Sequence, residues 1–127
     1  MSQIRATTIS DAAGTGPITL TGQSAAKAWV NFDGTSTISI RDSFNVSSLS
    51  DQGGGNYIIN FSNSFSATTY SNALTARGLS GDIGGCGTEN HDVGRNVGSL
   101  QVYSLRLDNG NAFDTLSFNA QLHGDLA

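Results

Sequence analysis

Residues 28–41 read AWVNFDGTSTISIR, and this stretch decides the fold. Apolar and polar side chains alternate with a period of two over residues 28–32 and again over residues 35–41, a pattern typical of half-buried β-strands. Between them lies Asp33-Gly34, a preferred type I′ hairpin turn because both residues tolerate positive φ. The stretch therefore predicts an antiparallel hairpin. Its expected apolar face consists of Ala28, Val30, Phe32, Ile38 and Ile40.

The same alternation recurs further along the chain. Turn sequences at residues 50–56 and 108–111 separate the runs that show it. The further strands are predicted at residues 43–49, 57–61, 99–107 and 115–123. Within these strands, the side chains expected to share an apolar face are Phe44 and Val46; Tyr57, Ile59 and Phe61; Tyr103, Leu105 and Leu107; and Leu116, Phe118, Ala120 and Leu122.

Two regions lack a clear period. Residues 65–77 fit either a strand or one short turn. Residues 78–98 contain seven glycines and follow neither a helical nor a strand period, which predicts an exposed loop or a set of loops. No segment has a convincing helical period, so the expected class is all-β.

The composition agrees with strands that have polar outer faces. Charged residues make up 13% of the chain, against about 25% in typical domains. The chain holds 16 Gly and a single Pro, whereas helix bundles need more Ala, Leu, Glu and Lys. The apolar fraction of 37% is also low. We therefore expect identical copies to share a core, because an oligomer can be stable where the lone protomer is not.

Charge and motif content argue against several partners. The six basic residues are scattered and the net charge is −4, whereas binding to nucleic acid needs clustered Lys and Arg. No apolar run approaches the roughly 20 residues of a membrane-spanning helix, so membrane insertion is not expected. Residues 1–5 lack the apolar stretch of a secretion signal, so synthesis in a cytosol is expected. Cys86 is the only cysteine, which excludes an intrachain disulfide.

Several runs together resemble one family. Residues 23–35, QSAAKAWVNFDGT, and residues 38–51, ISIRDSFNVSSLSD, resemble a segment that recurs in phage and prophage tail-fibre proteins, where it opens the C-terminal head domain. The run 56–61, NYIINF, and the closing stretch 116–125 are also similar to that family. Residues 8–16, TISDAAGTG, resemble the segment that joins the shaft to the head.

This resemblance is specific over residues 23–61 and weak over residues 65–98, where such a fibre would read its receptor. It implies an antiparallel, β-sandwich-like fibre head domain over residues 27–127, homotrimeric, preceded by a shaft-like leader over residues 1–26. The implied partners are further copies of the chain, other phage tail proteins and host cell-surface polysaccharide. The implied location is the virion, after synthesis in the host bacterial cytoplasm. Host, receptor, and tail versus head or collar fibre stay open.

Enzymatic chemistry is not indicated. A glycosidase needs two carboxylates about 5 or about 6.5–9.5 Å apart, and only Asp82, Glu89 and Asp92 share one region of the chain. Turn and cap roles explain such Asp residues. With His91 they could also hold a hard cation such as Ca²⁺, an alternative left open. The His and Cys spacings of a metal site are absent from the sequence. We therefore expect neither an enzyme nor a cofactor.

Short polar side chains in the Gly-rich region are the candidate receptor contacts, because they can form hydrogen bonds with sugar hydroxyls. These candidates are Asn90, His91, Asp92, Arg95 and Asn96. Tyr70 and Asn72 are further candidates at a loop or a sheet edge. Trp29 lies inside the predicted hairpin, which favours packing in the core or between protomers over stacking on a sugar.

Three functions are consistent with these features. An adhesin-like fibre head would use three identical sites to bind a repetitive cell surface by multivalency. A purely structural trimerisation, capping or connector module would close sheet edges around a threefold axis. A depolymerase fragment or self-cleaving chaperone domain is disfavoured by the single Glu and the small size of the chain.

Overall fold

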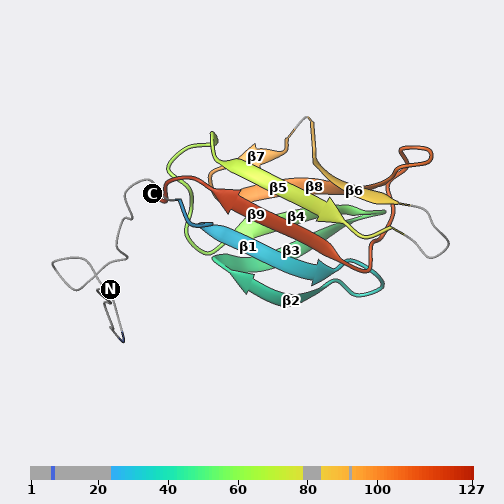
Figure 1. Ribbon diagram of the computed structural model, residues 1–127, viewed down its shortest axis with the longest axis horizontal. Coiled ribbons are helices and arrows are strands. Elements are labelled where there is room, and N and C mark those ends of the chain that lie inside the picture. The colour runs from blue at the N-terminus through green and yellow to red at the C-terminus, as the bar shows by residue number, and fades with distance from the viewer. Residues whose placement is uncertain (1–6, 8–23, 79–83, 92) are drawn as a thin grey trace, which may run out of the picture.

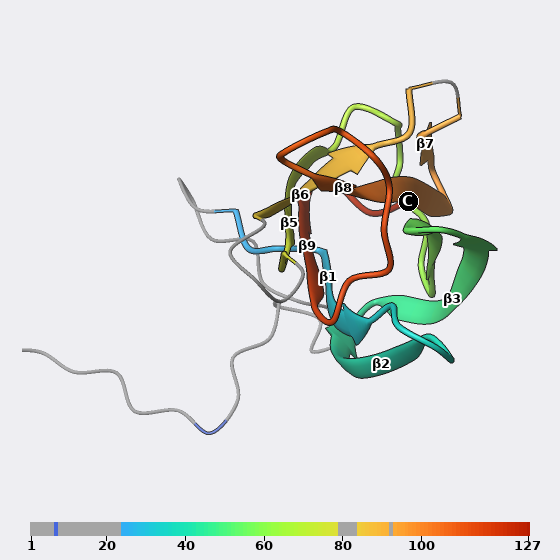
Figure 2. The same cartoon turned by 90° about the vertical axis from the view of Figure 1, so that its right-hand side faces the viewer.

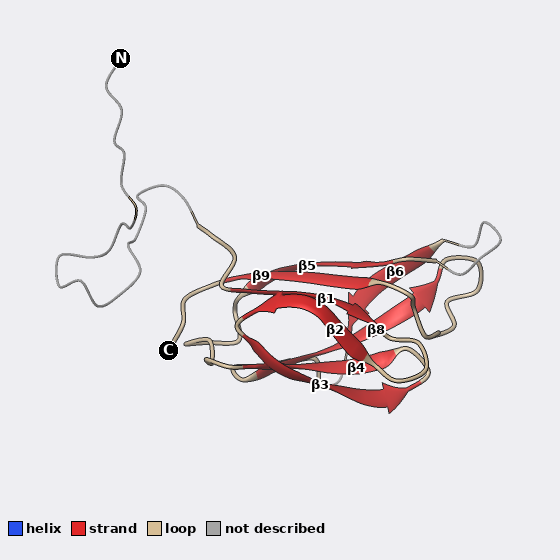
Figure 3. Cartoon of the chain, turned by 90° about the horizontal axis from the view of Figure 1, so that it is seen from below, coloured by secondary structure: helices blue, strands red, loops and turns tan. Residues whose placement is uncertain are grey.

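Two antiparallel β-sheets, packed against each other, form the described part of the protein (Figures 1 and 3). The structure is a computed structural model that describes residue 7 and residues 24–78, 84–91 and 93–127. Sheet A has the strand order β2-β1-β9-β5, and its strands are β1 (Ala28–Asp33), β2 (Ser39–Phe44), β5 (Ser71–Ala76) and β9 (Phe118–His123). Sheet B has the order β3-β4-β8-β6, with β7 also paired to β8, and its strands are β3 (Val46–Gly53), β4 (Asn56–Phe61), β6 (Gly85–Glu89), β7 (Arg95–Asn96) and β8 (Ser99–Arg106). No helix occurs among the described residues, so the all-β, antiparallel prediction is confirmed for them.

The two sheets approach each other along both of their edges (Figure 2). At one edge the chain passes from β2 to β3 through Asn45, which has φ 56°. Its side chain holds this corner, because Oδ1 accepts a hydrogen bond from the backbone N of Asn63 at 2.7 Å and Nδ2 donates to the carbonyl of Lys27 at 3.0 Å. The single strand predicted for residues 43–49 is therefore wrong: it bends here, and Phe44 remains 53% exposed.

The β1–β2 hairpin forms as predicted, but its turn does not. The pairing ends at Asp33↔Ser39, so the loop holds residues 34–38 instead of a two-residue turn. Positive φ occurs at Ser36, at 54°, and not at Gly34.

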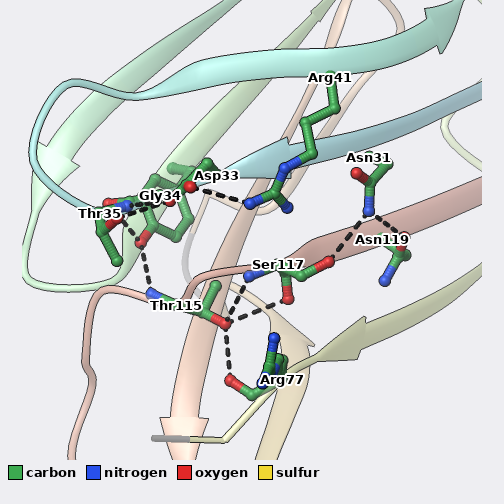
Figure 4. A network of polar contacts seen from close by, with 10 residues as sticks. Asn31, Asp33, Gly34, Thr35, Arg41, Arg77, Thr115, Ser117 and Asn119 are labelled. Atoms are coloured by element: carbon green, nitrogen blue, oxygen red, sulfur yellow. Dashed lines mark hydrogen bonds and ion pairs between the residues drawn. The ribbon is translucent and has the colours of Figure 1, made fainter.

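The side chain of Asp33 explains the shape of this loop. Its Oδ1 accepts hydrogen bonds from the backbone N of Thr35 at 2.9 Å and from Thr35 Oγ1 at 2.7 Å (Figure 4). Gly34 is required for a different reason than positive φ, because a Cβ there would lie 2.2 Å from Tyr57 Oη. The Asp33-Gly34 pair thus lets this loop pack closely against sheet B.

The core lies between the sheets and follows most of the predicted faces. The inner side chains of β1, β4 and β9 are buried as expected, namely Ala28, Val30, Phe32, Tyr57, Ile59, Phe61, Phe118, Ala120 and Leu122. Phe118 joins the layers, since its ring stacks on Phe32 at 5.2 Å and meets Tyr57 of sheet B at 6.3 Å. Ile38 packs against this core, whereas Ile40, which pairs with Phe32 on the edge strand β2, is 38% exposed.

One predicted face is wrong, and one residue of another lies outside the core. In β8 the buried side chains are Leu100, Val102 and Ser104, so the expected face of Tyr103, Leu105 and Leu107 points outward. The register with β4 decides this, because Ile59 pairs with Leu100 and Tyr57 with Val102. Leu116 precedes β9 and is 43% exposed.

The Gly-rich region is not only loop. Residues 85–89 form β6 and residues 95–96 form β7, which corrects the prediction of a loop over residues 78–98. Cβ atoms at Gly85 and Gly87 would lie 2.9 Å from the rings of Phe113 and Phe118. Glycine at these inward positions removes the apolar signal of the strand and lets its backbone come close to the core. The ambiguous residues 65–77 contain β5.

The inward apolar faces are satisfied within one chain. The expectation that these faces need other copies is therefore corrected, and any contact between copies falls to the outer surfaces. Residues 24–27 and the C-terminus lie at the same end of the sandwich (Figure 1). The predicted leader over residues 1–26 falls mostly outside the described residues. No described helix is long and apolar enough to cross a membrane.

Candidate functional site

Four side chains gather where β5, β6 and β7 meet at one edge of the sandwich. Tyr70 directly precedes β5, Asn72 lies in β5, Glu89 ends β6 and Arg95 begins β7. Since β5 is an edge strand of sheet A and β6 an edge strand of sheet B, this group joins the two sheets. We call these four residues the edge cluster.

Glu89 is the centre of the edge cluster. Its carboxylate accepts a hydrogen bond from Arg95 Nε to Oε2 at 2.7 Å and a second from Arg95 Nη2 to Oε1, which makes a bidentate ion pair. Asn72 Nδ2 also donates to Oε1. The hydrogen bonds from Arg95, the larger cause, and from Asn72 hold the pKa of Glu89 below its ordinary value, against the opposing effect of desolvation. The carboxylate is therefore ionised and fixed at neutral pH.

Tyr70 contacts Arg95 through both its backbone carbonyl and its ring. Arg95 Nη1 donates to the Tyr70 carbonyl at 2.7 Å, and the guanidinium carbon lies 5.5 Å from the centroid of the Tyr70 ring, within cation–π range. The Tyr70 hydroxyl donates to the carbonyls of Asn96 and Ser99 at 3.1 and 3.2 Å. Burial raises the pKa of Tyr70 to about 12. The phenol is thus a neutral, anchored support.

A hollow of about 260 Å³ opens beside the edge cluster, lined by Asn72, Leu74, Gly87, Thr88 and Glu89. It lies along the side of β6 that faces β5, and among the described strands β6 pairs only with β8. The unpaired edge of such a strand presents backbone donors and acceptors. The hollow therefore combines an amide, a carboxylate, strand-edge backbone groups and the apolar side chain of Leu74. This chemistry suits a small ligand that carries several hydroxyl groups.

The structure describes four of the five predicted receptor residues and places them in different surroundings. Arg95 belongs to the edge cluster, and the backbone carbonyl of Asn96 accepts the Tyr70 hydroxyl. Asn90 instead donates from Nδ2 to Tyr103 Oη at 3.2 Å, on the outer side of sheet B. His91 lies in the exposed turn that follows, and Asp92 lies outside the described residues.

The further candidates Tyr70 and Asn72 do come together with Arg95. Sequence reasoning missed Glu89 as their centre, and it missed Gly87 and Thr88 as lining residues. One signal was available: Glu89 is the only Glu in the chain and stands six positions before an Arg.

The Glu89 carboxylate is arranged for binding. Both of its oxygens already accept hydrogen bonds from Arg95, and it keeps lone pairs for one further donor. Among the described residues, no group of three or more His, Cys, Asp or Glu side chains could hold a metal ion. Asp82 and Asp92, which the Ca²⁺ alternative needs, lie outside the described residues.

A second polar network lies at the opposite end of β5 (Figure 4). The buried Thr115 donates from Oγ1 to the Arg77 carbonyl at 2.7 Å and accepts from the backbone N of Ser117 at 3.3 Å. Tyr57 Oη donates to the Gly34 carbonyl at 3.3 Å, and burial raises the pKa of this phenol to about 12. Because these partners are mostly main-chain groups, this network fixes loops and is structural.

Comparison of the chain with protein-family models, with curated proteins and with solved structures found no match.

Proposed function

We propose that this domain is a glycan-binding module of a trimeric phage tail fibre, and that the hollow beside the edge cluster holds a sugar unit of a host-surface polysaccharide. The observation that carries this proposal is the pair of Glu89 and Asn72, fixed by hydrogen bonds beside the open hollow. Side chains that are already ordered bind hydroxyl groups with a small further loss of entropy.

Two features of the sequence support the fibre part of the proposal. Residues 23–61 resemble the opening of tail-fibre head domains. The low share of charged residues, 13%, suits recognition of polar, uncharged surfaces by hydrogen bonds. Three copies on one axis would multiply a weak single-site affinity, as binding to a repetitive cell surface requires.

Binding of the purified chain to an array of bacterial surface glycans tests the site. We expect binding to at least one glycan, and Asn72→Ala should weaken it about three- to tenfold, the effect of roughly one hydrogen bond. The matched control is Asn119→Ala, an exposed Asn of β9 in sheet A. No glycan binding by the unmodified chain, or equal behaviour of the two variants, contradicts the proposal.

The trimer is tested separately by light scattering. A mass near three times the 13.1 kDa of the chain is expected. The outer face of sheet A is where we propose the contact, because Phe44, 53% exposed, stands opposite Trp29 on it. Phe44→Asp should therefore lower the mass to that of a single chain. A chain that is already single at micromolar concentration contradicts the trimer.

The second candidate function is a purely structural trimerisation, capping or connector module. It is favoured by the same exposed Phe44 beside Trp29, which needs no glycan to explain it. A stable trimer that binds neither glycans nor whole host cells would support this candidate over the first.

A further inference from the structure

The outer face of sheet B carries amide and hydroxyl side chains in two hydrogen-bonded groups, one around Asn56, Gln101 and Tyr103 and one around Asn60. We name it the amide face and define it by Asn56, Ile58, Asn60, Asn90, Gln101 and Tyr103. In β4 the neighbours Tyr57 and Ile59 are buried, as are Leu100 and Val102 in β8, so the side chains between them point away from the core. Cross-strand pairing places Asn56 opposite Tyr103 and Ile58 opposite Gln101. These side chains therefore lie next to each other on one surface.

The amides of this face are oriented by hydrogen bonds to one another. Gln101 Nε2 donates to Asn56 Oδ1 at 2.9 Å. Tyr103 Oη accepts from Asn56 Nδ2 at 3.4 Å and from Asn90 Nδ2 at 3.2 Å. Asn60 Nδ2 points to Ser48 Oγ at 3.1 Å and Ser50 Oγ at 3.3 Å.

Each primary amide has two N–H donors and an oxygen with two lone pairs. The bonds within the network use only part of this capacity at Asn56, Asn60 and Gln101, so these three amides keep donors and acceptors for a ligand. Because the network fixes the direction of these groups, a bound ligand would not have to order them.

This face is also uncharged. The outward positions of β4, β6 and β8 hold Asn, Ile, Cys, Thr, Ser, Gln, Tyr and Leu, and none of these described positions has a formal charge. In β3, Ser48 and Ser50 stand opposite the outward Asn60 and Ile58, whereas the charged Asp51 stands opposite the inward Tyr57. The outer face of sheet A, in contrast, carries Asp33 and Asp42 on neighbouring strands. A phosphorylated or carboxylated ligand would find no cation on the amide face, and a basic one would find no carboxylate. A neutral ligand rich in hydroxyl groups complements it.

We infer that the amide face binds a neutral polysaccharide chain laid across β3, β4 and β8. The amides and the Tyr103 hydroxyl bind sugar hydroxyls, while the Tyr103 ring and Ile58 contact the apolar faces of the sugar rings. This inference rests on the proposed function and extends it, because the hollow holds one sugar unit and the amide face holds the main chain of the polymer.

Affinity electrophoresis of the full chain through gels containing neutral polysaccharides (dextran, mannan or galactan) tests the inference, with polygalacturonate as the acidic comparison. We expect retardation by a neutral polymer. Tyr103→Ala and Gln101→Ala should each weaken retardation about tenfold. Tyr103→Phe, which keeps the ring, should lose only about two- to threefold. The matched control is Asn111→Ala, an exposed Asn in the loop after β8, which should bind as the unmodified chain does.

The outcomes separate the two proposals. One outcome is that neutral polymers retard the chain and that Asn72→Ala weakens this retardation, whereas Tyr103→Ala and Gln101→Ala do not. Binding at the amide face is then wrong, and binding in the hollow stands. If no polymer retards the folded chain, both fail. If Tyr103→Ala changes the mass in solution, the amide face is a contact between copies, which also overturns the inference. Retardation by polygalacturonate alone overturns the neutral ligand. Circular dichroism spectra like that of the unmodified chain show that the variants fold.

Discussion

The two outer faces of the sandwich are built by the same alternation of side chains and yet differ in chemistry. On sheet A, Trp29 and Phe44 stand opposite each other on β1 and β2, and Asp33 forms an ion pair with Arg41 (Figure 4). On sheet B, Tyr103 stands among uncharged amides. The inner faces only make the fold, so the outer positions are where function is decided. The exposed aromatic side chain and the charges of sheet A suit contact with protein, and the amide face suits contact with sugar.

The largest expected effect comes from a change in the core, which lies between the two sheets and supports both outer faces. Phe118 is fully buried and contacts Phe32 and Tyr57, so Phe118→Ala should lower the free energy of unfolding by about 3–5 kcal/mol. Both faces should be lost together in a single urea transition followed by circular dichroism. Separate transitions for the two sheets would show that the faces fold independently and would break the comparison.

A smaller loss of unfolding free energy is expected from a change in β6, at one edge of sheet B. A Cβ at Gly87 would lie 2.9 Å from Phe118 Cζ and 3.1 Å from Leu74 Cβ, so Gly87→Ala should cost about 1–3 kcal/mol by overpacking. The matched control is Gly98→Ala, where the added Cβ would lie 3.5 Å from Ser64 Oγ, an ordinary contact. Equal unfolding midpoints for the two variants would mean that β6 does not approach the core as closely as described.

These glycines also explain what the sequence could and could not predict. β1, β4 and β9 were predictable because large apolar side chains occupy their inward positions. β6 was not, since Gly85 and Gly87 take those positions and leave no period. In β8 both faces carry apolar side chains, so only the register with β4, a contact between distant segments, decides which face is buried.

The candidate site was likewise predictable only where a local pattern marked its residues. Arg95 could be singled out from its polar neighbourhood. Its partner Glu89 and the bridge from Asn72, 17 residues away in the sequence, depend on how β5 lies along β6. That arrangement is a tertiary property which no local pattern contains.

A matched pair of variants sharpens the difference between the faces. Asn31 Nδ2 donates to Ser117 Oγ at 3.0 Å and also to Asn119 Oδ1 on sheet A, much as Gln101 donates to Asn56 on sheet B. Asn31→Ala and Gln101→Ala should each cost about 0.5–1.5 kcal/mol of unfolding free energy, measured in urea. Only Gln101→Ala should also weaken retardation by neutral polysaccharide. A loss of retardation in both variants would mean that the faces do not differ in function.

The smallest expected effect concerns the unfolding free energy at acidic pH. The pKa of Glu89 is lowered from its ordinary value of 4.5, mainly by the hydrogen bonds from Arg95. A lowered pKa in the folded state stabilises the protein above pH 4.5, and this contribution is lost as the pH falls through the folded value. Because the ion pair is partly exposed and screened by solvent, Glu89→Gln should cost less than about 1 kcal/mol at pH 7.

Unfolding in urea between pH 7 and pH 3 measures this contribution. The gap between Glu89→Gln and the unmodified chain should shrink toward pH 3, because protonation of Glu89 removes from the unmodified chain the ion pair that the variant lacks at every pH. The pKa of Asp33 is also lowered, chiefly by its hydrogen bonds with Thr35. Both proteins should therefore still lose some unfolding free energy as the pH falls. Asp33→Asn, a change in sheet A, should reduce this loss. A gap that stays constant with pH would mean that Glu89 acts through packing alone. The edge cluster would then hold its carboxylate less firmly than a sugar-binding site on this edge requires.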